Sequence, residues 1–341
     1  MRWPSAAAVV VLCAVATCAQ DPSNWSESPA VGLGPLLLRA QSPLAILRLS
    51  PTPETPVTLH QGQWQVGLLS SWNNYFDVDP KRYTIDAETL RFTVGAAYGI
   101  TSRLELQAAF PVSYRGGGIL DRFIENFEDL LGVPNEKRKQ APRNRYLILI
   151  HGNDGRTFER SGSDSGWGIE DATVTTRYQL AVGTETSPAV TASVILKIPA
   201  GRAASLFSSS GYDVAGGLSV GQRIGRFNVY GSLVGIHYAT TEIVGVELRP
   251  NEFSLFTGAE YRYSPRTSWL LQTLVTSPGA KHFGDFSKNS YEITLGFKHV
   301  LSADLLLEAS VLENFFIFDN SPDVGFHVGI VWRSSAPRAG R

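Results

Sequence analysis

Cysteine is scarce in this chain of 341 residues: the sequence has two, Cys13 and Cys18. Both fall in residues 1–19, where one arginine, an apolar run and small residues at the cleavage position predict a secretory signal peptide. After cleavage, the mature chain would have no thiol for a disulfide, a metal site or a nucleophile. The alternative is a lipid-anchored Cys18, although Thr17 before it fits a lipoprotein cleavage motif poorly.

The sequence also lacks a long apolar run. No segment approaches the roughly 18 consecutive apolar residues that a membrane-spanning helix requires, so we expect no such helix. A large excess of charge of one sign is missing too, since the formal net charge is −1 at pH 7. Nucleic-acid binding needs a concentrated basic surface, so we expect no nucleic-acid partner. No linker or change of composition divides the chain, which indicates one domain.

What the sequence has in abundance is the alternation of apolar and polar residues. Trp64, Val66, Leu68 and Trp72 share one face of the first predicted strand, and polar or small residues share the other. The same period of two recurs to the end of the segment 323–333, in stretches about twice the usual strand length of about 5 to 6 residues. Long strands with few helices predict a barrel.

The connections between the predicted strands alternate in length. Short turns such as GITS and RIGR alternate with long loops such as FDVDPKRYT (76–84), and outer-membrane barrels have short periplasmic turns and longer extracellular loops. The alternation gives twelve strands if residues 146–152 belong to an extracellular insertion, and fourteen is the nearest alternative. We therefore predict an all-β, transmembrane, antiparallel up-and-down barrel in the bacterial outer membrane. A soluble β-sandwich or barrel with the same periodicity is the other interpretation.

The predicted barrel would be a monomer that contacts outer-membrane lipid and is inserted by the barrel assembly machinery. Its predicted parts are a signal peptide (1–19), an irregular periplasmic lead-in rich in proline (20–59), the barrel (60–333) and a carboxy-terminal tail (334–341). One long extracellular insertion, residues 114–166, interrupts the barrel.

The insertion contains one predicted helix, residues 119–131, because apolar residues such as Ile124 recur there at spacings of three and four. Its apolar face must be buried, and the nearest cover is the barrel mouth, so we expect the insertion to act as a lid or plug. Two carboxylates of the helix, Asp121 and Glu125, lie four residues apart on one face. They would bind a cation, act as an acid and a base, or pair with a nearby basic side chain such as Arg122. The candidate residues of this loop or plug are Asp121, Glu125, Phe123, Phe127, Arg138 and Arg143.

The run GGGILDRFIENFEDLLGVPNEKRKQAPRNRY, with GWGIEDATVTTRYQL and VILKIPAGR after it, resembles an uncharacterised bacterial family of outer-membrane β-barrel proteins known only as a domain of unknown function. The likeness covers most of the mature chain. Its most specific part is the loop, at Gly117, Gly118, Leu120, Asp121, Ile124, Glu125, Phe127, Gly132, Pro134 and Arg138. The family pattern has a histidine where this chain has Glu128, which argues against chemistry by a loop histidine. The resemblance implies a location and a fold but no activity.

The polar strand faces of a membrane barrel line its lumen. The candidate lumen-lining residues are Arg91, Arg103, Glu105, Asp171, Arg177, Lys197, Glu260, Arg262, Glu292, Lys298 and Glu308. Both signs of charge are present, which fits ion pairs that pack a narrow interior and equally fits a narrow solute path. A barrel of twelve strands is intermediate in size between small filled barrels and open porins. The strand number therefore does not distinguish a packed interior from a narrow solute path.

We expect a narrow channel or transporter for a small, possibly hydrophobic or amphiphilic solute. A structural or adhesive barrel without a solute path is the first alternative, and a lipid-acting enzyme is the second. Such an enzyme would need a serine beside a histidine on the outer face, and the wall histidines His237 and His299 have no serine partner in the pattern. We therefore predict that the protein is not an enzyme and has no catalytic residues, no metal and no cofactor.

Overall fold

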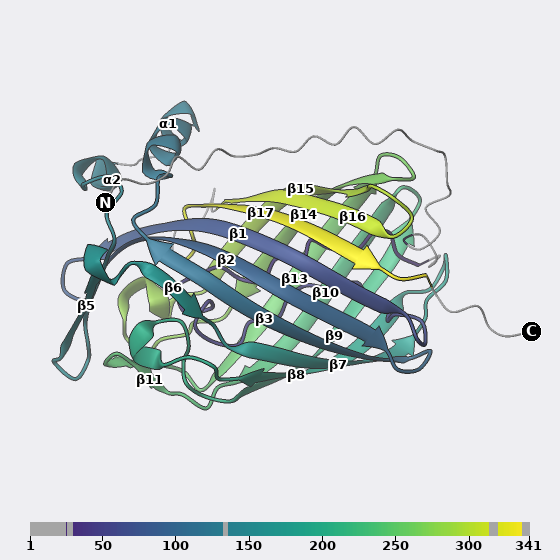
Figure 1. Ribbon diagram of the computed structural model, residues 1–341, viewed down its shortest axis with the longest axis horizontal. Coiled ribbons are helices and arrows are strands. Elements are labelled where there is room, and N and C mark those ends of the chain that lie inside the picture. Colours follow the sequence, from purple (N-terminus) through teal and green to yellow (C-terminus); the bar gives the residue numbers. More distant parts are fainter. Residues whose placement is uncertain (1–24, 26–29, 132–135, 314–319, 336–341) are drawn as a thin grey trace, which may run out of the picture.

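The computed structural model describes Trp25 and residues 30–131, 136–313 and 320–335. The predicted signal peptide and most of the predicted tail lie outside these residues. Twelve strands of a fifteen-stranded antiparallel sheet close into a barrel, which confirms the predicted fold class and strand number (Figure 1). The wall strands are β1 (Trp64–Asp79), β2 (Tyr83–Gly99), β3 (Leu104–Gly116), β7 (Ala172–Ala181), β8 (Ala189–Ile198), β9 (Asp213–Ile224), β10 (Phe227–His237), β13 (Asn251–Arg262), β14 (Thr267–Thr276), β15 (Ser290–Val300), β16 (Leu305–Glu313) and β17 (Val324–Arg333).

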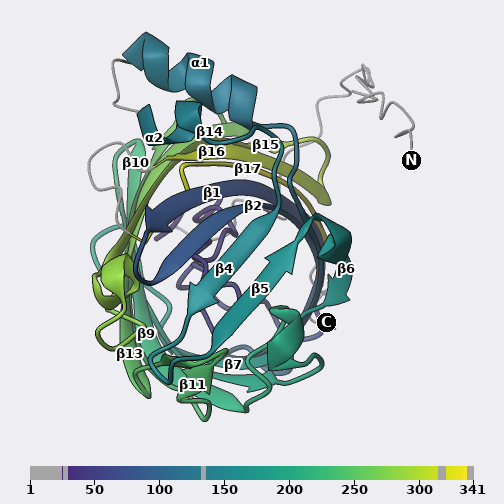
Figure 2. The same ribbon diagram turned by 90° about the vertical axis from the view of Figure 1, so that its left-hand side faces the viewer.

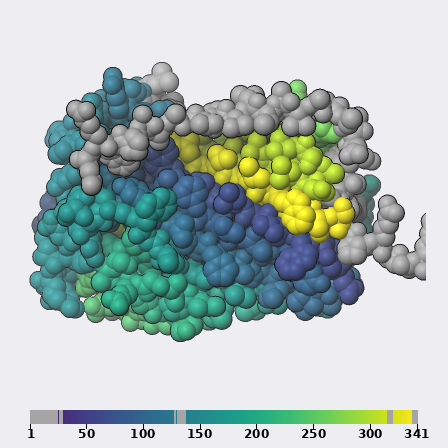
Figure 3. All heavy atoms as spheres, in the orientation of Figure 1, coloured from purple at the N-terminus to yellow at the C-terminus, as the bar shows by residue number. Residues whose placement is uncertain are grey.

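The ring closes between the first and the last wall strand. β1 pairs with β17 in an antiparallel register that runs from Gln65 opposite Arg333 to Asn74 opposite Val324. In Figure 3 the yellow surface of β16 and β17 lies beside the purple and blue surface of β1 and β2, so the closing seam is on this face. Closure pairs both strands that would otherwise be sheet edges.

The wall is apolar outside and charged inside. Leu68 and Phe110 are 55% and 62% exposed on the outer face, whereas Glu260 and Glu308 are 0% exposed in the interior. This distribution is the reverse of that in a water-soluble domain, where large apolar side chains are inside and carboxylates are outside. It is the pattern of a barrel whose outer face contacts lipid.

The two ends of the barrel differ. The short turns lie at one end, and the chain enters β1 and leaves β17 there; we call it the turn end. The long connections lie at the other, the loop end. β1 and β2 extend beyond the ring at the loop end as far as Asp79 and Tyr83, so the predicted long loop 76–84 is wrong. The strands continue because Tyr75, Tyr83 and Ile85 are buried there against the loops that cover this end.

The insertion forms separate elements at the loop end. They are α1 (Asp121–Leu131), α2 (Glu136–Gln140), β4 (Leu147–His151), β5 (Thr157–Ser161) and β6 (Gly166–Ile169). β4 pairs with the extension of β2, with Tyr83 opposite Ile150, and β5 pairs with β4. Residues 147–151 therefore form a strand outside the closed ring, as the count of twelve requires. Figure 2 shows β4 and β5 running across the open end of the barrel, while α1 lies outside the ring.

The described part of the predicted periplasmic lead-in lies inside the barrel, so that prediction is wrong for residues 30–59. Figure 2 shows this segment as the purple trace within the ring. Its prolines, among them Pro35, Pro43 and Pro51, disfavour a helix or a central strand, so its remaining backbone N–H groups need other acceptors. The interior of the wall supplies these acceptors. We call residues 30–59 the plug.

Candidate functional site

The first leg of the plug climbs from the turn end to the loop end along β13 to β16. Glu260 accepts hydrogen bonds from the backbone N–H groups of Leu33 (2.9 Å) and Gly34 (3.2 Å). Higher in the lumen, Glu292 accepts from the backbone N–H groups of Gln41 (2.8 Å) and Ser42 (3.0 Å). Between these levels Gln272 and Glu308 accept from Leu36 (3.1 Å) and Leu37 (3.0 Å). Buried carboxylates of the wall thus bind an irregular backbone that no strand pairs with.

The plug turns at the loop end, and Arg48 holds the turn. Its guanidinium forms an ion pair with Glu252 (2.6 Å), donates to the carbonyl of Arg249 (2.6 Å) and lies over the ring of Tyr238. The Arg48 side chain is 1% exposed, so this pair is shielded from water. Buried charges in proteins are stable only when they are paired in this way.

The second leg descends along β9, β7 and β3 and uses the same type of contact. Asp213 accepts from the N–H of Leu49 (3.1 Å), Gln179 from Thr58 (2.8 Å) and Glu105 from Leu59 (2.6 Å). The side chain of Glu54 in this leg also forms an ion pair with Arg177 of the wall (3.1 Å). The plug therefore enters and leaves the lumen at the turn end.

Most of the predicted lumen-lining residues lie in this interior, and ion pairs join many of them. The pairs between described wall residues are Arg91–Glu170 (2.7 Å), Arg177–Glu105 (2.8 Å), Lys197–Asp171 (2.6 Å), Lys197–Asp213 (3.1 Å), Lys298–Glu308 (3.0 Å) and His327–Glu308 (2.7 Å). Glu260 and Glu292 take part in none of these pairs, and their donors include N–H groups of the plug backbone. The mixed charges thus do two things: they neutralise one another, and they bind the plug.

Two of the predicted lining residues lie elsewhere. Arg103 is exposed in the turn between β2 and β3, and Arg262 is partly exposed at the turn end, where its guanidinium is 3.5 Å from the carbonyl of Pro265. Strand parity places both on the lumen face, but both lie where the wall meets solvent.

Several functional residues escaped the sequence reasoning because their partners are far away in the chain. Arg39, Arg48 and Glu54 belong to the plug, whose lack of periodicity suggested a segment outside the barrel. Arg115 falls inside the predicted insertion, and Glu170 lies between the insertion and the next predicted strand, so neither was counted as a lumen residue. One signal could have indicated a segment inside the barrel. A proline-rich stretch comes directly before the first strand, and the wall strands carry many inward carboxylates that can accept hydrogen bonds from its backbone.

Little continuous space remains around the plug. The interior contains cavities of about 170 Å³ near the turn end, about 50 and 30 Å³ at mid-height, and about 90 Å³ at the loop end. A water molecule takes roughly 30 Å³ of liquid, so each cavity holds only a few waters. With the plug in this position, the described residues leave no wide path through the lumen.

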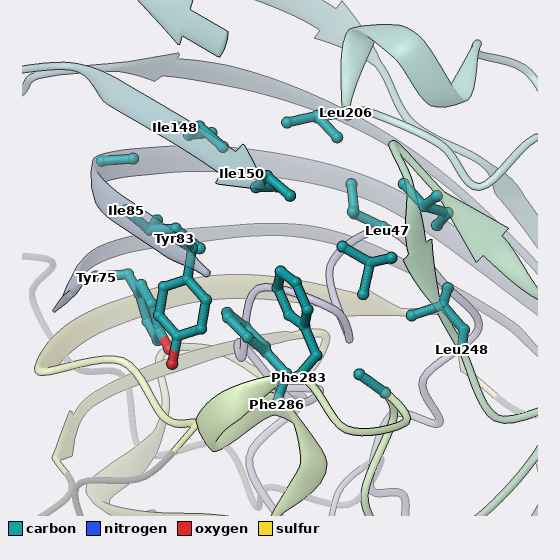
Figure 4. Packing of buried hydrophobic residues seen from close by; sticks show 14 of the residues in the cluster. Leu47, Tyr75, Tyr83, Ile85, Ile148, Ile150, Leu206, Leu248, Phe283 and Phe286 are labelled. Carbon is teal, nitrogen blue, oxygen red and sulfur yellow. The ribbon is translucent and has the colours of Figure 1, made fainter. Parts of the chain in front are cut away.

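An apolar cluster covers the loop end of the plug (Figure 4). Ile148 and Ile150 of β4 face Leu47 of the plug tip, and Phe283 and Phe286 close the opposite side. Tyr83 packs edge-on against Phe286, with ring centroids 4.9 Å apart. Burial of each large apolar side chain contributes about 1.5–3 kcal/mol, which stabilises the β4–β5 hairpin in its place across the loop end. We call this hairpin, residues 147–161, the lid.

The tip of the lid is fastened to the connection that contains β11 (Glu242–Ile243) and β12 (Val246–Glu247). The N–H of Asn153 donates to the carbonyl of Gly245 (2.8 Å), and Arg156 lies 3.3 Å from Glu242. The lid is thus held at both ends, by β2 at its base and by this connection at its tip.

The helix α1 does not occupy the mouth, contrary to the predicted burial of its apolar face there. Leu120 and Ile124 pack on the outer rim against Val324, with Trp72 and Phe326 beside them. The ring of Phe123 meets that of Phe326 edge-on at 5.7 Å. The amphipathic pattern correctly requires an apolar partner, and the outward side chains of β1 and β17 supply it. The covering of the mouth belongs to the lid.

The carboxylates of α1 pair with basic residues of the same insertion. Arg138 lies 3.0 Å from Asp121 and also contacts Asp323, while Arg143 lies 2.6 Å from Glu125. Burial raises the pKa of Asp323, and the charge of Arg138 acts against this rise. Arg138 thus links Asp121 of the helix to Asp323 at the rim, whereas the pair of Arg143 with Glu125 joins two parts of the insertion. Phe127 lies in α1, but its side chain is outside the described part of the structure.

The two histidines considered for a lipid-acting enzyme lie beside partners other than serine. His237 is 2.8 Å from the side-chain oxygen of Asn251, and His299 is 2.8 Å from the hydroxyl of Thr267. No cluster of metal-ligating side chains occurs among the residues that the structure describes. Within the same residues, no helix has the length and apolar character needed to cross a membrane.

The closed wall of twelve strands, apolar outside and charged inside, defines the fold class of outer-membrane β-barrels. The chain belongs to a family described as protein of unknown function (DUF3187), whose model matches residues 9–334. No curated protein sequence matches this chain.

Solved structures agree with this fold. The COG4313 outer membrane channel from Pseudomonas putida F1 is similar with a TM-score of 0.55 and 13% identity, over 83% of this chain and 100% of that chain. The NanC porin follows with a TM-score of 0.45 and 10% identity, over 78% of this chain and 98% of that chain. The KdgM porin has a TM-score of 0.40 and 8% identity, over 79% and 98%. The likeness to the first of these shows the fold.

Proposed function

We propose that this protein is a gated channel of the bacterial outer membrane, whose lumen is closed by its own amino-terminal plug. The solute is small and apolar or amphiphilic, and the lid covers the loop end, which faces the outside of the cell. The apolar outer wall contacts outer-membrane lipid, and the barrel acts as a monomer.

One observation carries this proposal: the plug is bound by wall side chains and is not paired as a strand of the sheet. The acceptors of its backbone, Glu260, Glu292 and Glu105 among them, project from strands whose own backbone groups are already paired in the ring. Removal of the plug therefore breaks no ladder hydrogen bond of the wall. Water can replace the plug as the partner of these charged groups, so an open lumen is physically accessible.

The test is the conductance of the mature protein in planar lipid bilayers, with and without residues 30–59. We expect the full chain to conduct weakly and the deletion to raise the single-channel conductance roughly tenfold, as for a barrel whose lumen becomes filled with water. Both proteins must migrate faster on gels when unboiled than when boiled, which verifies a closed barrel. A properly folded deletion that conducts no better than the full chain would remove the channel from consideration.

The filled interior also favours a second candidate, a structural or adhesive barrel without a solute path. Buried ion pairs such as Lys197 with Asp171 (2.6 Å) make the interior a packed core as well as a binding site for the plug. The same conductance experiment separates the two candidates, since a structural barrel needs no space behind its plug. No observation favours a lipid-acting enzyme.

The location and orientation have their own test. The mature chain would contain no cysteine, so a single cysteine introduced at Ser163 or at Thr184 is a clean probe. Ser163 lies in the insertion at the loop end, and Thr184 lies in the short turn between β7 and β8. We expect a membrane-impermeant maleimide to label Ser163→Cys on whole cells and to leave Thr184→Cys unlabelled. The opposite pattern would reverse the proposed orientation.

A further inference from the structure

The cavity of about 90 Å³ at the loop end lies between the plug tip, the lid and the wall. The part of the cavity beneath the lid is apolar and is lined by Ile148 of the lid, Leu206 and Phe283. Its wall side is different, because Asn73, Thr89 and Arg115 line it from three neighbouring strands. Asn73 is registered opposite Thr89, and Thr89 opposite Arg115, so the three residues form one polar row across β1, β2 and β3.

Within this row Arg115 is the residue that lacks a counter-charge. Its side chain is buried, at 3% exposure, and one of its terminal nitrogens donates to the carbonyl of Leu206. The other two nitrogens, Nε and Nη2, have no hydrogen-bond partner among the described residues. The carboxylate of Glu170 is already occupied, by Arg91 at 2.7 Å and by the hydroxyl of Ser113. The guanidinium also lies over the ring of Phe207, 4.7 Å from its centroid. This contact does not neutralise the charge, and two of the nitrogens still lack an acceptor, so the site favours an anion.

We propose that this cavity binds a small organic monocarboxylate, whose apolar body lies beneath the lid and whose carboxylate meets Arg115. The inference rests on the proposed function and specifies its solute as an amphiphilic anion. The planar guanidinium presents two N–H groups side by side and matches a carboxylate in a bidentate arrangement. The volume of about 90 Å³ limits the apolar body to a few carbon atoms and excludes a long chain.

Contact with the plug tip makes this site part of the gate. Gln41, Leu44 and Leu47 of the plug all line the cavity, and the side-chain oxygen of Gln41 accepts from Asn73 (2.7 Å). A bound carboxylate therefore touches lid, wall and plug together. A ligand that fits better when the plug has shifted would favour the open lumen by its difference in affinity between the two states.

The experiment measures binding to the full mature protein in detergent by isothermal titration calorimetry, with propanoate and its neutral amide, propanamide. These probes share shape and differ in charge. We expect the acid to bind at least about tenfold more tightly than the amide, which is the ratio that 1.4 kcal/mol produces. Arg115→Met should abolish this preference and leave the affinity for the amide in place. Arg103→Met, which removes an exposed arginine of the turn end, is the matched control and should bind like the parent.

A second variant keeps the test valid if Arg115→Met fails to form a heat-resistant barrel. Ile148→Trp fills the cavity from the lid and leaves Arg115 intact, so it should abolish binding of both probes. Equal affinity for acid and amide, no binding of either, or an unchanged preference in Arg115→Met would overturn the inference. Because calorimetry needs no conduction, such a result leaves the conductance of the plug deletion as an independent measure of the channel.

Discussion

Two segments of this chain, the plug and the insertion, lie outside the barrel wall and are held by opposite chemistry. The plug offers its backbone N–H groups to buried carboxylates such as Glu260 and Glu292. The insertion pairs its own strands, packs α1 against outward apolar side chains, and joins its charges to one another through Arg138 and Arg143. The plug thus depends on the wall for its shape, whereas the insertion largely builds its own.

This difference indicates which segment can move. Exchange of the plug for water changes the free energy by a modest net amount per hydrogen bond, because water solvates charged groups and backbone amides well. The buried plug side chains, such as Leu36 and Leu49, add an apolar contribution, but no backbone pairing of the wall is lost. Water cannot replace an apolar contact such as that of Ile124 with Val324, because exposing these side chains to water is unfavourable. We therefore expect the plug to be the moving part of the gate and α1 to be a fixed part of the rim.

The largest expected effect comes from removing the acceptors that hold the plug. The triple variant Glu105→Ala, Glu260→Ala and Glu292→Ala takes anchors from both legs, and hydrogen bonds to charged groups contribute about 1.5–3 kcal/mol each. We expect single-channel conductance to approach that of the protein without residues 30–59.

The matched control for this triple variant replaces three exposed carboxylates, Glu159, Glu185 and Glu242, with alanine. It should conduct like the parent. A triple wall variant that folds, keeps its low conductance and protects the plug from protease would show that the carboxylates are not the anchors.

The next effect is a contrast between two deletions. Removal of residues 118–141 takes away α1 and α2 and exposes an apolar rim that the membrane can cover, so the barrel should still assemble. We expect its conductance to equal that of the full chain, because the described contacts of α1 are on the outer rim. A conductance as high as that of the plug deletion would instead make the helix part of the gate.

A smaller, local effect is expected from Arg138→Ala. The variant leaves Asp121 and Asp323 buried without their partner, and loss of one member of a buried pair costs about 3–5 kcal/mol. The insertion should become sensitive to protease while conductance stays the same. Arg143→Ala is the comparison variant, since the Arg143 side chain is 58% exposed and its pair with Glu125 is screened by water. Equal protease sensitivity of both variants would contradict the assigned anchor.

The smallest effect is expected at the tip of the lid. Arg156 is 75% exposed, and its contact with Glu242 at 3.3 Å is a surface pair of the kind that contributes little. Arg156→Ala should therefore leave hydrogen exchange of the β4 amides unchanged. Ile148→Asp, which places a charge in the apolar cluster, should speed that exchange strongly. A marked effect of Arg156→Ala would mean that the exposed contact controls the lid.

The wall was predictable because lipid on one side and polar groups on the other impose a period of two on each strand. That period alone assigned Leu68 and Phe110 to the outer face of the wall and Glu260 and Lys197 to the lumen face. The position of α1 was not predictable, because an amphipathic pattern shows that Ile124 needs an apolar neighbour but does not show which one. The plug escaped for a related reason, since residues such as Leu33 and Glu260 are separated by 227 positions.

The route of the plug has a mechanical consequence. Both legs enter at the turn end, so a pull on the amino-terminal leg from that side loads its contacts in sequence, first at Glu260 and last at Glu292. Each step releases one or two hydrogen bonds, whereas a pull on both legs together would load them all at once. Force applied to one leg therefore peels the plug away in small steps, while the ring of strands bears little load.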